Sequence, residues 1–125
     1  HVRDVMRQGD ALPRVSPQAS FIELMREMSA KALGAAIVVD ENDRVVGVFT
    51  DGDLRRCVER GQDLRGLVAQ DVMSRQPRSV RPEQLAVEAA DLMEQARIGL
   101  VIVADAQGGL VGAVSINDLM RAKVI

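Results

Sequence analysis

The sequence predicts an α/β (α+β) fold built from two tandem β-α-β-β-α repeats packed about a pseudo-twofold axis. The chain matches itself at an offset of 65 positions, where residues 47–54 (GVFTDGDL) align with residues 112–119 (GAVSINDL). The same register places Val15 over Val80 without a gap. Repeats of this size seldom bury their apolar faces alone, so we expect the two copies to pack on each other.

Each half shows the periodicity of a short opening strand, a helix, a strand hairpin and a final helix. In the first half, Ser20 and Glu23 have the spacing of a capping box at a helix start. The elements expected there are a strand at 14–15, a helix at 21–32, strands at 35–39 and 45–49, and a helix from 51 to a C-cap at Gly61. The second half repeats this order with a strand at 79–80, a helix at 85–95, strands at 100–103 and 110–114, and a helix from 116.

The connector before each repeat contains a further repeated sequence. Residues 71–73 (DVM) match residues 4–6 (DVM) at an offset of 67, so the two connectors differ slightly in length. We divide the chain into a first repeat at 1–66 and a second at 67–125. The abrupt start at His1 suggests a piece of a longer protein.

Composition excludes several classes of function. The formal net charge is -2, and Phe21 and Phe49 are the only aromatic side chains, so a basic, base-stacking face for nucleic acid is not expected. No apolar run is long enough to span a bilayer, which predicts no membrane segment. The single Cys57 fits a cytoplasmic protein. With His1 as the only imidazole, neither a histidine-based triad nor a zinc site is expected.

The repeated pattern G-h-h-[TS]-x-x-D, in which h is apolar, has a chemical meaning. A strand that turns directly into a helix leaves backbone N–H groups free at the helix start, and a hydroxyl beside them adds a donor for phosphate. Thr50 and Ser115 are the predicted phosphate ligands. Asp53 and Asp118, three residues on, are placed to accept hydrogen bonds from the vicinal hydroxyls of a ribose. The structural alternative is that these four residues only cap two helices.

The twofold unit with this motif closing each copy resembles the CBS domain pair, or Bateman module, and the resemblance covers essentially the whole chain. In that family, two repeats form clefts that bind nucleotides such as AMP, ATP or S-adenosylmethionine. The resemblance implies that the segments around Val15, Ser16, Val80 and Arg81 meet the base through backbone groups. It also implies that Gly34, Ala35, Gly99 and Leu100 line the clefts.

A narrower resemblance rests on residues 49–56 (FTDGDLRR), 85–89 (LAVEA) and 118–122 (DLMRA). These are similar to the C-terminal CBS pair of bacterial D-arabinose 5-phosphate isomerases, which act at the head of the pathway to the lipopolysaccharide sugar Kdo. The resemblance implies a regulatory segment with no enzymatic activity of its own, attached to a sugar-isomerase domain that has no counterpart here. The chain departs from the pattern at 115–117, where that family often has His-Met-His, and at Lys123, where a glycine is common.

The expected ligand is a ribonucleotide, and no other cofactor or metal is predicted. Pathway logic favours CMP-Kdo as a feedback signal, whereas the wider family favours an adenine nucleotide. Arg55, Arg56 and Arg121 could neutralise such anions or could simply be solvated helix residues. Asp51 adds a negative charge near the first proposed phosphate site, whereas the second copy has Ile116, so electrostatics favour a phosphate in the second cleft.

Two other classes of function compete with nucleotide binding. A ligand-free dimerisation module is the main rival, and we expect homo-oligomers through the CBS pairs in either case. An enzyme could use Asp51 and Asp53 to bind Mg²⁺, although the second copy keeps only Asp118. A calcium loop at 40–43 is excluded, because Arg44 occupies a ligand position and the central glycine is missing.

Overall fold

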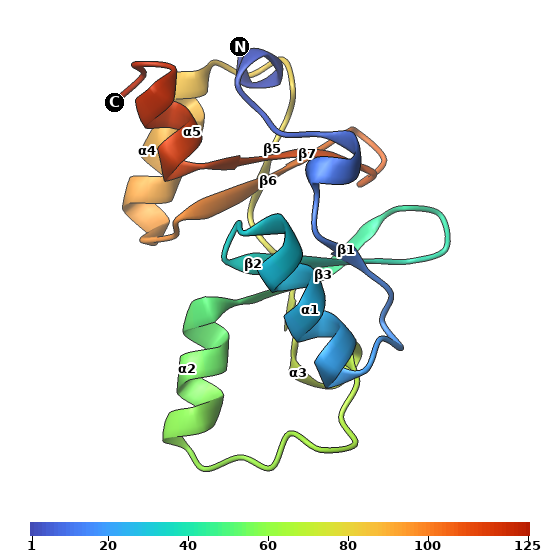
Figure 1. The fold of residues 1–125 in the computed structure, drawn as a ribbon. Coiled ribbons are helices and arrows are strands. Elements are labelled where there is room, and N and C mark those ends of the chain that lie inside the picture. The colour runs from blue at the N-terminus through green and yellow to red at the C-terminus, as the bar shows by residue number, and fades with distance from the viewer. The chain divides into compact units, whose positions relative to one another are not determined.

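The computed structural model describes residues 1–125 and forms two compact units. The first-repeat unit contains residues 13–77, and the second-repeat unit joins residues 1–12 to residues 78–125. Each unit has its own small sheet with helices against it (Figure 1). The N-terminal segment, blue in Figure 1, is therefore part of the unit that contains the C-terminus.

The first-repeat unit has a four-stranded sheet in the order β1-β2-β3-β4. Its strands are β1 (Arg14–Val15), β2 (Ala35–Val39), β3 (Val45–Thr50) and β4 (Ser74–Arg75). Its helices are α1 (Phe21–Lys31), α2 (Asp51–Glu59) and the short α3 (Ala69–Val72). β1 runs parallel to β2, whereas β2 with β3 and β3 with β4 are antiparallel.

The core of this unit forms where α1 packs against the sheet. The hydroxyl of Ser20 accepts a hydrogen bond from the Glu23 amide at 3.2 Å, which caps the helix start as the sequence predicts. Leu24 is then fully buried, and the helix ends at Ala32 with a left-handed φ of 56°. Phe49 is also fully buried and meets the Phe21 ring edge to face.

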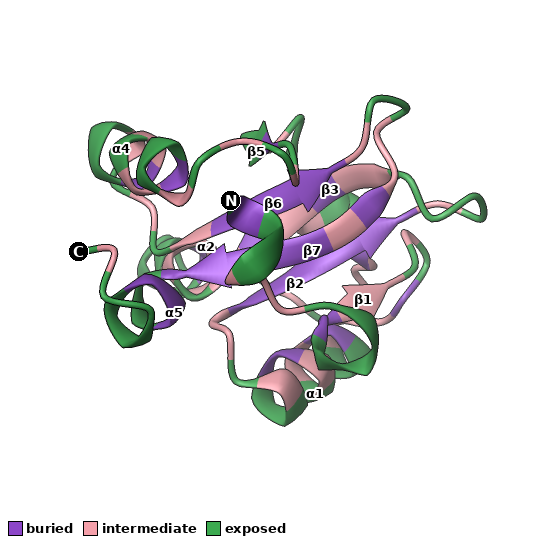
Figure 2. Ribbon diagram, turned by 90° about the horizontal axis from the view of Figure 1, so that it is seen from above, coloured by how far each residue is buried: buried purple, intermediate pink, exposed green.

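The second-repeat unit has a three-stranded sheet in the order β5-β6-β7. Its elements are the 3₁₀ turns η1 (Val2–Asp4) and η2 (Gly9–Ala11), strands β5 (Ser79–Val80), β6 (Leu100–Ala104) and β7 (Leu110–Ser115), and helices α4 (Ala86–Ala96) and α5 (Ile116–Arg121). Figure 2 shows β6 and β7 largely buried, while the outer face of α4 is exposed. The core is built mainly from valines of β6 and β7 together with Leu119 of α5 and Met93 of α4.

Each connector packs in the unit of the other repeat. The amides of Val2 and Arg3 donate to the carbonyls of Gln84 at 2.7 Å and Pro82 at 3.0 Å. Val2 is fully buried, so the first connector contributes to the core of the second-repeat unit. Because the connectors are exchanged, the compact units divide the chain at residues 12/13 and 77/78 and not at the repeat boundary of 66/67.

The second connector makes the same contacts in the first-repeat unit. The amides of Ala69 and Gln70 each donate at 2.9 Å to the carbonyls of Ala19 and Pro17, respectively. Ala69, like Val2, is fully buried. The two connectors are thus equivalent at the offset of 67 that the DVM echo suggested.

A glycine in each sheet permits this approach of the connector. A Cβ atom built on Gly112 would lie 2.5 Å from Met6 Sδ and 2.9 Å from the Arg7 carbonyl oxygen. At Gly47 the equivalent atom would overlap Met73 Sδ and lie 2.9 Å from the Ser74 carbonyl oxygen. Both distances to backbone oxygen are shorter than carbon tolerates, so only glycine fits here.

The fold class is confirmed: the structure is a mixed α and β fold with the predicted order of strands and helices in both halves. Element ends differ by one residue, as where α4 begins at Ala86 and β3 continues to Thr50. The turns η1 and η2, helix α3 and strand β4 were not predicted, because each is very short and depends on contacts with distant residues. No helix combines the length and the apolar character needed to cross a bilayer.

Candidate functional site

The predicted ligand residues lie at two strand-to-helix junctions, one in each unit. Thr50 ends β3 and caps α2: its Oγ1 accepts from the Asp53 amide at 3.1 Å, while Asp53 Oδ2 accepts from the Thr50 amide at 2.9 Å. Ser115 and Asp118 form the same reciprocal pair between β7 and α5, at 3.1 and 2.9 Å. The two junctions are therefore local copies of one geometry.

The four residues do cap two helices, as the alternative interpretation expects, but capping still leaves them able to bind a ligand. Each hydroxyl uses its oxygen as an acceptor toward the helix amide, which leaves its O–H as a donor for a ligand. Each aspartate uses one oxygen toward the backbone. Whether Thr50 and Ser115 hold phosphate and Asp53 and Asp118 hold ribose stays a prediction.

An arginine one turn into each helix meets the aspartate of its junction. Arg56 Nη2 lies 2.6 Å from Asp53 Oδ1, and Arg121 Nη2 lies 2.5 Å from Asp118 Oδ1. The arginine side chains are 51% and 65% exposed, so each guanidinium keeps an open face. Each arginine can therefore meet a ligand anion beside the carboxylate that it already holds.

Asp118 is the more enclosed carboxylate, with a side chain 6% exposed against 16% for Asp53. A second arginine reaches it: Arg7 Nε lies 3.1 Å from Oδ1 and 3.3 Å from Oδ2. Burial by itself raises the pKa of Asp118, but the hydrogen bonds from Ser115 and the positive charge of Arg7 outweigh burial and hold the pKa below its ordinary value. Asp118 is therefore a stable anion in the folded unit.

Four residues expected to line the ligand clefts lie beside the junctions, and their contact with a ligand stays a prediction. Ala35 pairs with Thr50 across β2 and β3, and the Asp51 amide donates to the Gly34 carbonyl at 2.9 Å. In the second-repeat unit the corresponding residues are Leu100, which pairs with Ser115, and Gly99, whose carbonyl accepts from the Ile116 amide at 3.1 Å. Each unit thus brings its glycine, its strand start and its motif hydroxyl together.

Val15 and Ser16 are not brought to the junction of their own unit. Val15 pairs with Val38, three residues along β2 from Ala35, and Ser16 continues toward the far end of that strand. There, residues 14–18 and 39–41 line an open hollow of about 420 Å³.

Val80 and Arg81 occupy the equivalent place in the second-repeat unit. Val80 pairs with Val103 and is buried, whereas the Arg81 amide is held by Gln84 Oε1 at 2.8 Å. The Pro82 carbonyl is already used by the connector amide of Arg3. Contacts between these segments and a base stay a prediction.

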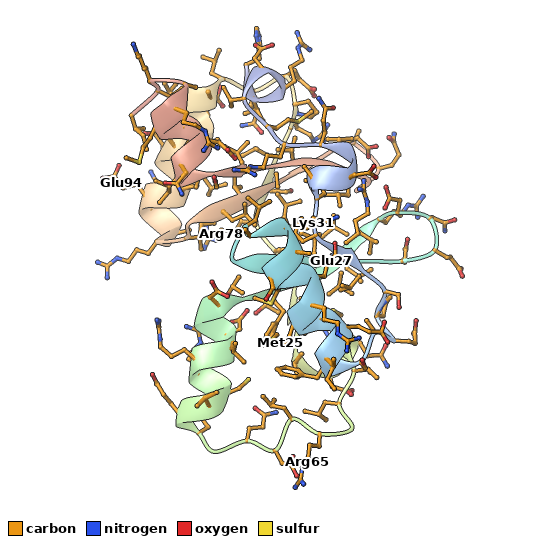
Figure 3. All side chains as sticks on the ribbon, viewed as in Figure 1. Met25, Glu27, Lys31, Arg65, Arg78 and Glu94 are labelled. Atoms are coloured by element: carbon orange, nitrogen blue, oxygen red, sulfur yellow. The ribbon has the colours of Figure 1, made fainter.

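A second hollow of about 470 Å³ lies between the start of α1 and the loop at 62–68. Phe21, Ile22 and Leu64 contribute apolar surface to it. Arg65 points away from the loop, is 92% exposed, and pairs with Asp63 (Figure 3). None of the predicted ligand residues lines this hollow.

Arg7 was not among the sequence-predicted site residues, and the structure adds it. The sequence did contain an indication of it. At the offset of 67 that aligns the two DVM segments, the next residues, Arg7 and Ser74, occupy equivalent positions. The structure confirms this equivalence: Arg7 pairs with Ala113 of β7, and Ser74 pairs with Val48 of β3. The arginine is therefore a difference between the two repeats at one structural position.

Comparison with known proteins agrees with these repeats. The CBS domain model matches residues 2–60 and again residues 68–125. Arabinose 5-phosphate isomerase KdsD from Pseudomonas aeruginosa is 44% identical over 99% of this chain, which spans 38% of the length of that relative.

Solved structures share the fold over nearly the whole chain. CBSX2 in complex with AMP has a TM-score of 0.87 and 29% identity, covering 98% of this chain and 95% of that one. A CBS domain protein from Pyrobaculum aerophilum complexed with AMP has a TM-score of 0.83 and 25% identity, covering 94% and 88% of the two chains. With two family matches that together cover most of its length, the chain belongs to the CBS domain family and carries the domain twice.

Proposed function

We propose that this chain is the regulatory, nucleotide-binding CBS pair of a sugar-phosphate isomerase of the arabinose 5-phosphate isomerase type. The observation that carries the proposal is the pair of strand-to-helix junctions, each presenting a hydroxyl, a carboxylate and an arginine beside a glycine-led strand start. The similarity to KdsD supports the parent enzyme, and the two AMP complexes among the related structures support the ligand class.

The ligand is a ribonucleotide whose ribose hydroxyls donate to Asp53 or Asp118 and whose phosphate meets Thr50 or Ser115. CMP-Kdo is the candidate that fits feedback control of Kdo formation in lipopolysaccharide biosynthesis. An adenine nucleotide, AMP or ATP, is the second candidate and is favoured by the related AMP complexes. Both junctions carry an arginine, Arg56 or Arg121, but the first also carries the carboxylate of Asp51 where the second has Ile116, so the second junction suits an anionic ligand better.

Regulation follows from differential binding. A ligand changes an equilibrium only when it binds one conformation better than another, and the gain in binding energy is then available to bias an attached isomerase domain. Residues 1–125 themselves carry no isomerase chemistry in this proposal. The parent protein is placed in the cytoplasm, where its sugar-phosphate substrates are, and forms homo-oligomers through its CBS pairs.

Calorimetric titration of the purified chain with CMP-Kdo, AMP and ATP in parallel tests the proposal. Asp53→Ala and Asp118→Ala should each weaken binding at their own junction by roughly 10- to 100-fold, because a charge-assisted hydrogen bond contributes about 1.5 to 3 kcal/mol. Asp91→Ala, at an exposed aspartate of α4, is the matched control and should bind like the wild type.

The three possible results separate the candidates. Saturable binding of CMP-Kdo that an aspartate variant abolishes supports a sensor of the pathway product. Binding of AMP or ATP alone supports the adenine-nucleotide sensor. If no nucleotide binds to the wild type, the nucleotide proposal is wrong and the ligand-free dimerisation module is the better interpretation, with oligomeric state unchanged in both aspartate variants.

A further inference from the structure

The two junction carboxylates differ in how many donors they already hold. A carboxylate has about four lone-pair positions, two on each oxygen. Asp118 Oδ1 accepts from Arg121 Nη2 at 2.5 Å and from Arg7 Nε at 3.1 Å. Asp118 Oδ2 accepts from the Ser115 amide at 2.9 Å and from the same Arg7 Nε at 3.3 Å. All four positions are occupied.

Asp53 has spare capacity. Its Oδ1 accepts from Arg56 Nη2 at 2.6 Å and its Oδ2 from the Thr50 amide at 2.9 Å, so one position on each oxygen stays open. A ribose diol needs two acceptor positions, one for each hydroxyl. Asp53 can receive that diol as it stands, whereas Asp118 can receive it only after losing a donor.

We propose that Arg7 is a latch that blocks ribose binding at Asp118 and leaves when a ligand enters. This inference rests on the proposed function. Of the three donors to Asp118, Arg7 is the one that can yield: its single Nε is shared between two oxygens at the longest distances of the set. The Ser115 amide is fixed by the helix cap, and Arg121 is held on the same helix at 2.5 Å.

The latch connects the ligand site to the N-terminal connector. The backbone of Arg7 exchanges two hydrogen bonds with Ala113 of β7, at 2.8 and 3.0 Å. Five residues earlier, Val2 is buried in the core of the same unit. A ligand that displaces the Arg7 side chain therefore acts on the connector itself. This gives the proposed regulation a physical path toward the N-terminal end of the chain.

The first-repeat unit supplies the natural comparison. Ser74 stands at the position equivalent to Arg7, is exposed, and pairs through its backbone with Val48. The donors to Asp53 are Thr50 and Arg56, both from its own junction. That junction is unlatched, so the two sites of the chain differ in affinity for the same ribose.

The experiment uses adenosine, which has the ribose diol but no phosphate, so that removing an arginine does not change attraction to a charged ligand. The background variant Asp53→Ala leaves only the Asp118 site. Adding Arg7→Ala should tighten adenosine binding about tenfold, as expected if the latch is closed in about nine molecules of ten. Arg3→Ala removes the same charge from the same connector without touching Asp118 and should change nothing. 2′,3′-Dideoxyadenosine should show no gain.

A reciprocal variant keeps the test decisive if Arg7→Ala lowers stability. In the Asp118→Ala background, Ser74→Arg should install a latch on Asp53 and weaken adenosine binding about tenfold. Circular dichroism of each variant checks that it is folded.

The outcomes distinguish this inference from the proposed function. If wild-type chain binds nucleotide but Arg7→Ala and Ser74→Arg leave adenosine affinity unchanged, the latch is wrong and the proposed function stands. Weaker binding in Arg7→Ala would make Arg7 a ligand contact and would also overturn the latch. If adenosine, AMP, ATP and CMP-Kdo all fail to bind to every variant, the proposed function fails, and the latch fails with it.

Discussion

Asp118 shows how one buried carboxylate serves both the fold and the candidate site. Its two oxygens cap α5, hold Arg121 and receive Arg7 from a segment 111 positions away. Removing one partner of such a buried charged cluster destabilises the fold, because it leaves a buried charge without its partner. The same residue is the predicted ribose ligand, so stability and binding are coupled at this position.

The lowered pKa of Asp118 makes the second-repeat unit sensitive to acid. Because the folded-state pKa lies below the ordinary 3.8, the unfolded chain binds more protons between the two values. The stabilisation is complete above the ordinary pKa and is lost as the pH falls through the folded-state pKa. We expect Asp118→Asn to lower the free energy of unfolding by about 1 to 3 kcal/mol at pH 7 and to flatten its fall below pH about 4.

Chemical denaturation between pH about 3 and 7 measures this effect. Asp91→Asn, an exposed aspartate on α4, should retain the wild-type profile. An unchanged acid slope in Asp118→Asn would show that Asp118 does not account for the pH dependence.

At the scale of elements, the two connectors are held by close backbone contact rather than by large side chains. Each passes over a glycine inside a strand, Gly47 of β3 or Gly112 of β7, and lays a methionine against it. Glycine inside a strand lowers stability, because it loses more conformational entropy on folding than other residues. Its lack of a side chain lets the connector come near enough to exchange backbone hydrogen bonds, as Arg7 does with Ala113.

Gly112→Ala should therefore destabilise the protein by about 1 to 3 kcal/mol, as overpacking does in other tight interiors. The flexible Met6 side chain can move aside, but the Arg7 carbonyl oxygen at 2.9 Å belongs to the backbone. Gly99→Ala is the matched control, because nothing lies within 4 Å of its Cβ, and it should stay within about 0.5 kcal/mol of wild type. Thermal unfolding compares the two. Equal stability would mean that the connector does not need this close approach.

At the scale of the whole molecule, the order of the chain and the order of packing differ. Residues 1–12 belong with residues 78–125, whereas residues 13–77 form their own unit. Val2 alone buries a complete side chain in the second-repeat core, which contributes about 1.5 to 3 kcal/mol. A change at the N-terminus is thus a change to the C-terminal repeat.

Deleting residues 1–7 should loosen the second-repeat unit selectively. Hydrogen exchange read by mass spectrometry should become faster in residues 78–125, above all in β7 around Ala113, which loses its hydrogen bonds to Arg7. Residues 13–77 should keep the exchange rates of the full chain and serve as the internal control. Faster exchange spread evenly over both units, or confined to 13–77, would contradict the exchanged packing of the connectors.

Local patterns were enough to predict most of the fold. The capping box at Ser20, the β-branched runs of β2 and β3, and the constant offset between halves depend on neighbouring residues and on side-chain period, which a sequence displays directly. The capping aspartates were found for the same reason, since Thr50 and Asp53 are three residues apart.

Tertiary structure alone decided where the connectors go and what they touch. The exchange of residues 1–12 into the second-repeat unit, the glycine at 112 that admits them, and the ion pair of Arg7 with Asp118 all join residues far apart in the sequence, by 111 positions in the case of the ion pair. Loop closure and burial determine such contacts, and no local propensity encodes them. The sequence by itself determined two junctions of one pattern that differ at Asp51 and Ile116. Only packing added the difference in donors, because Arg7 folds onto one aspartate and Ser74 stands at the matching place near the other.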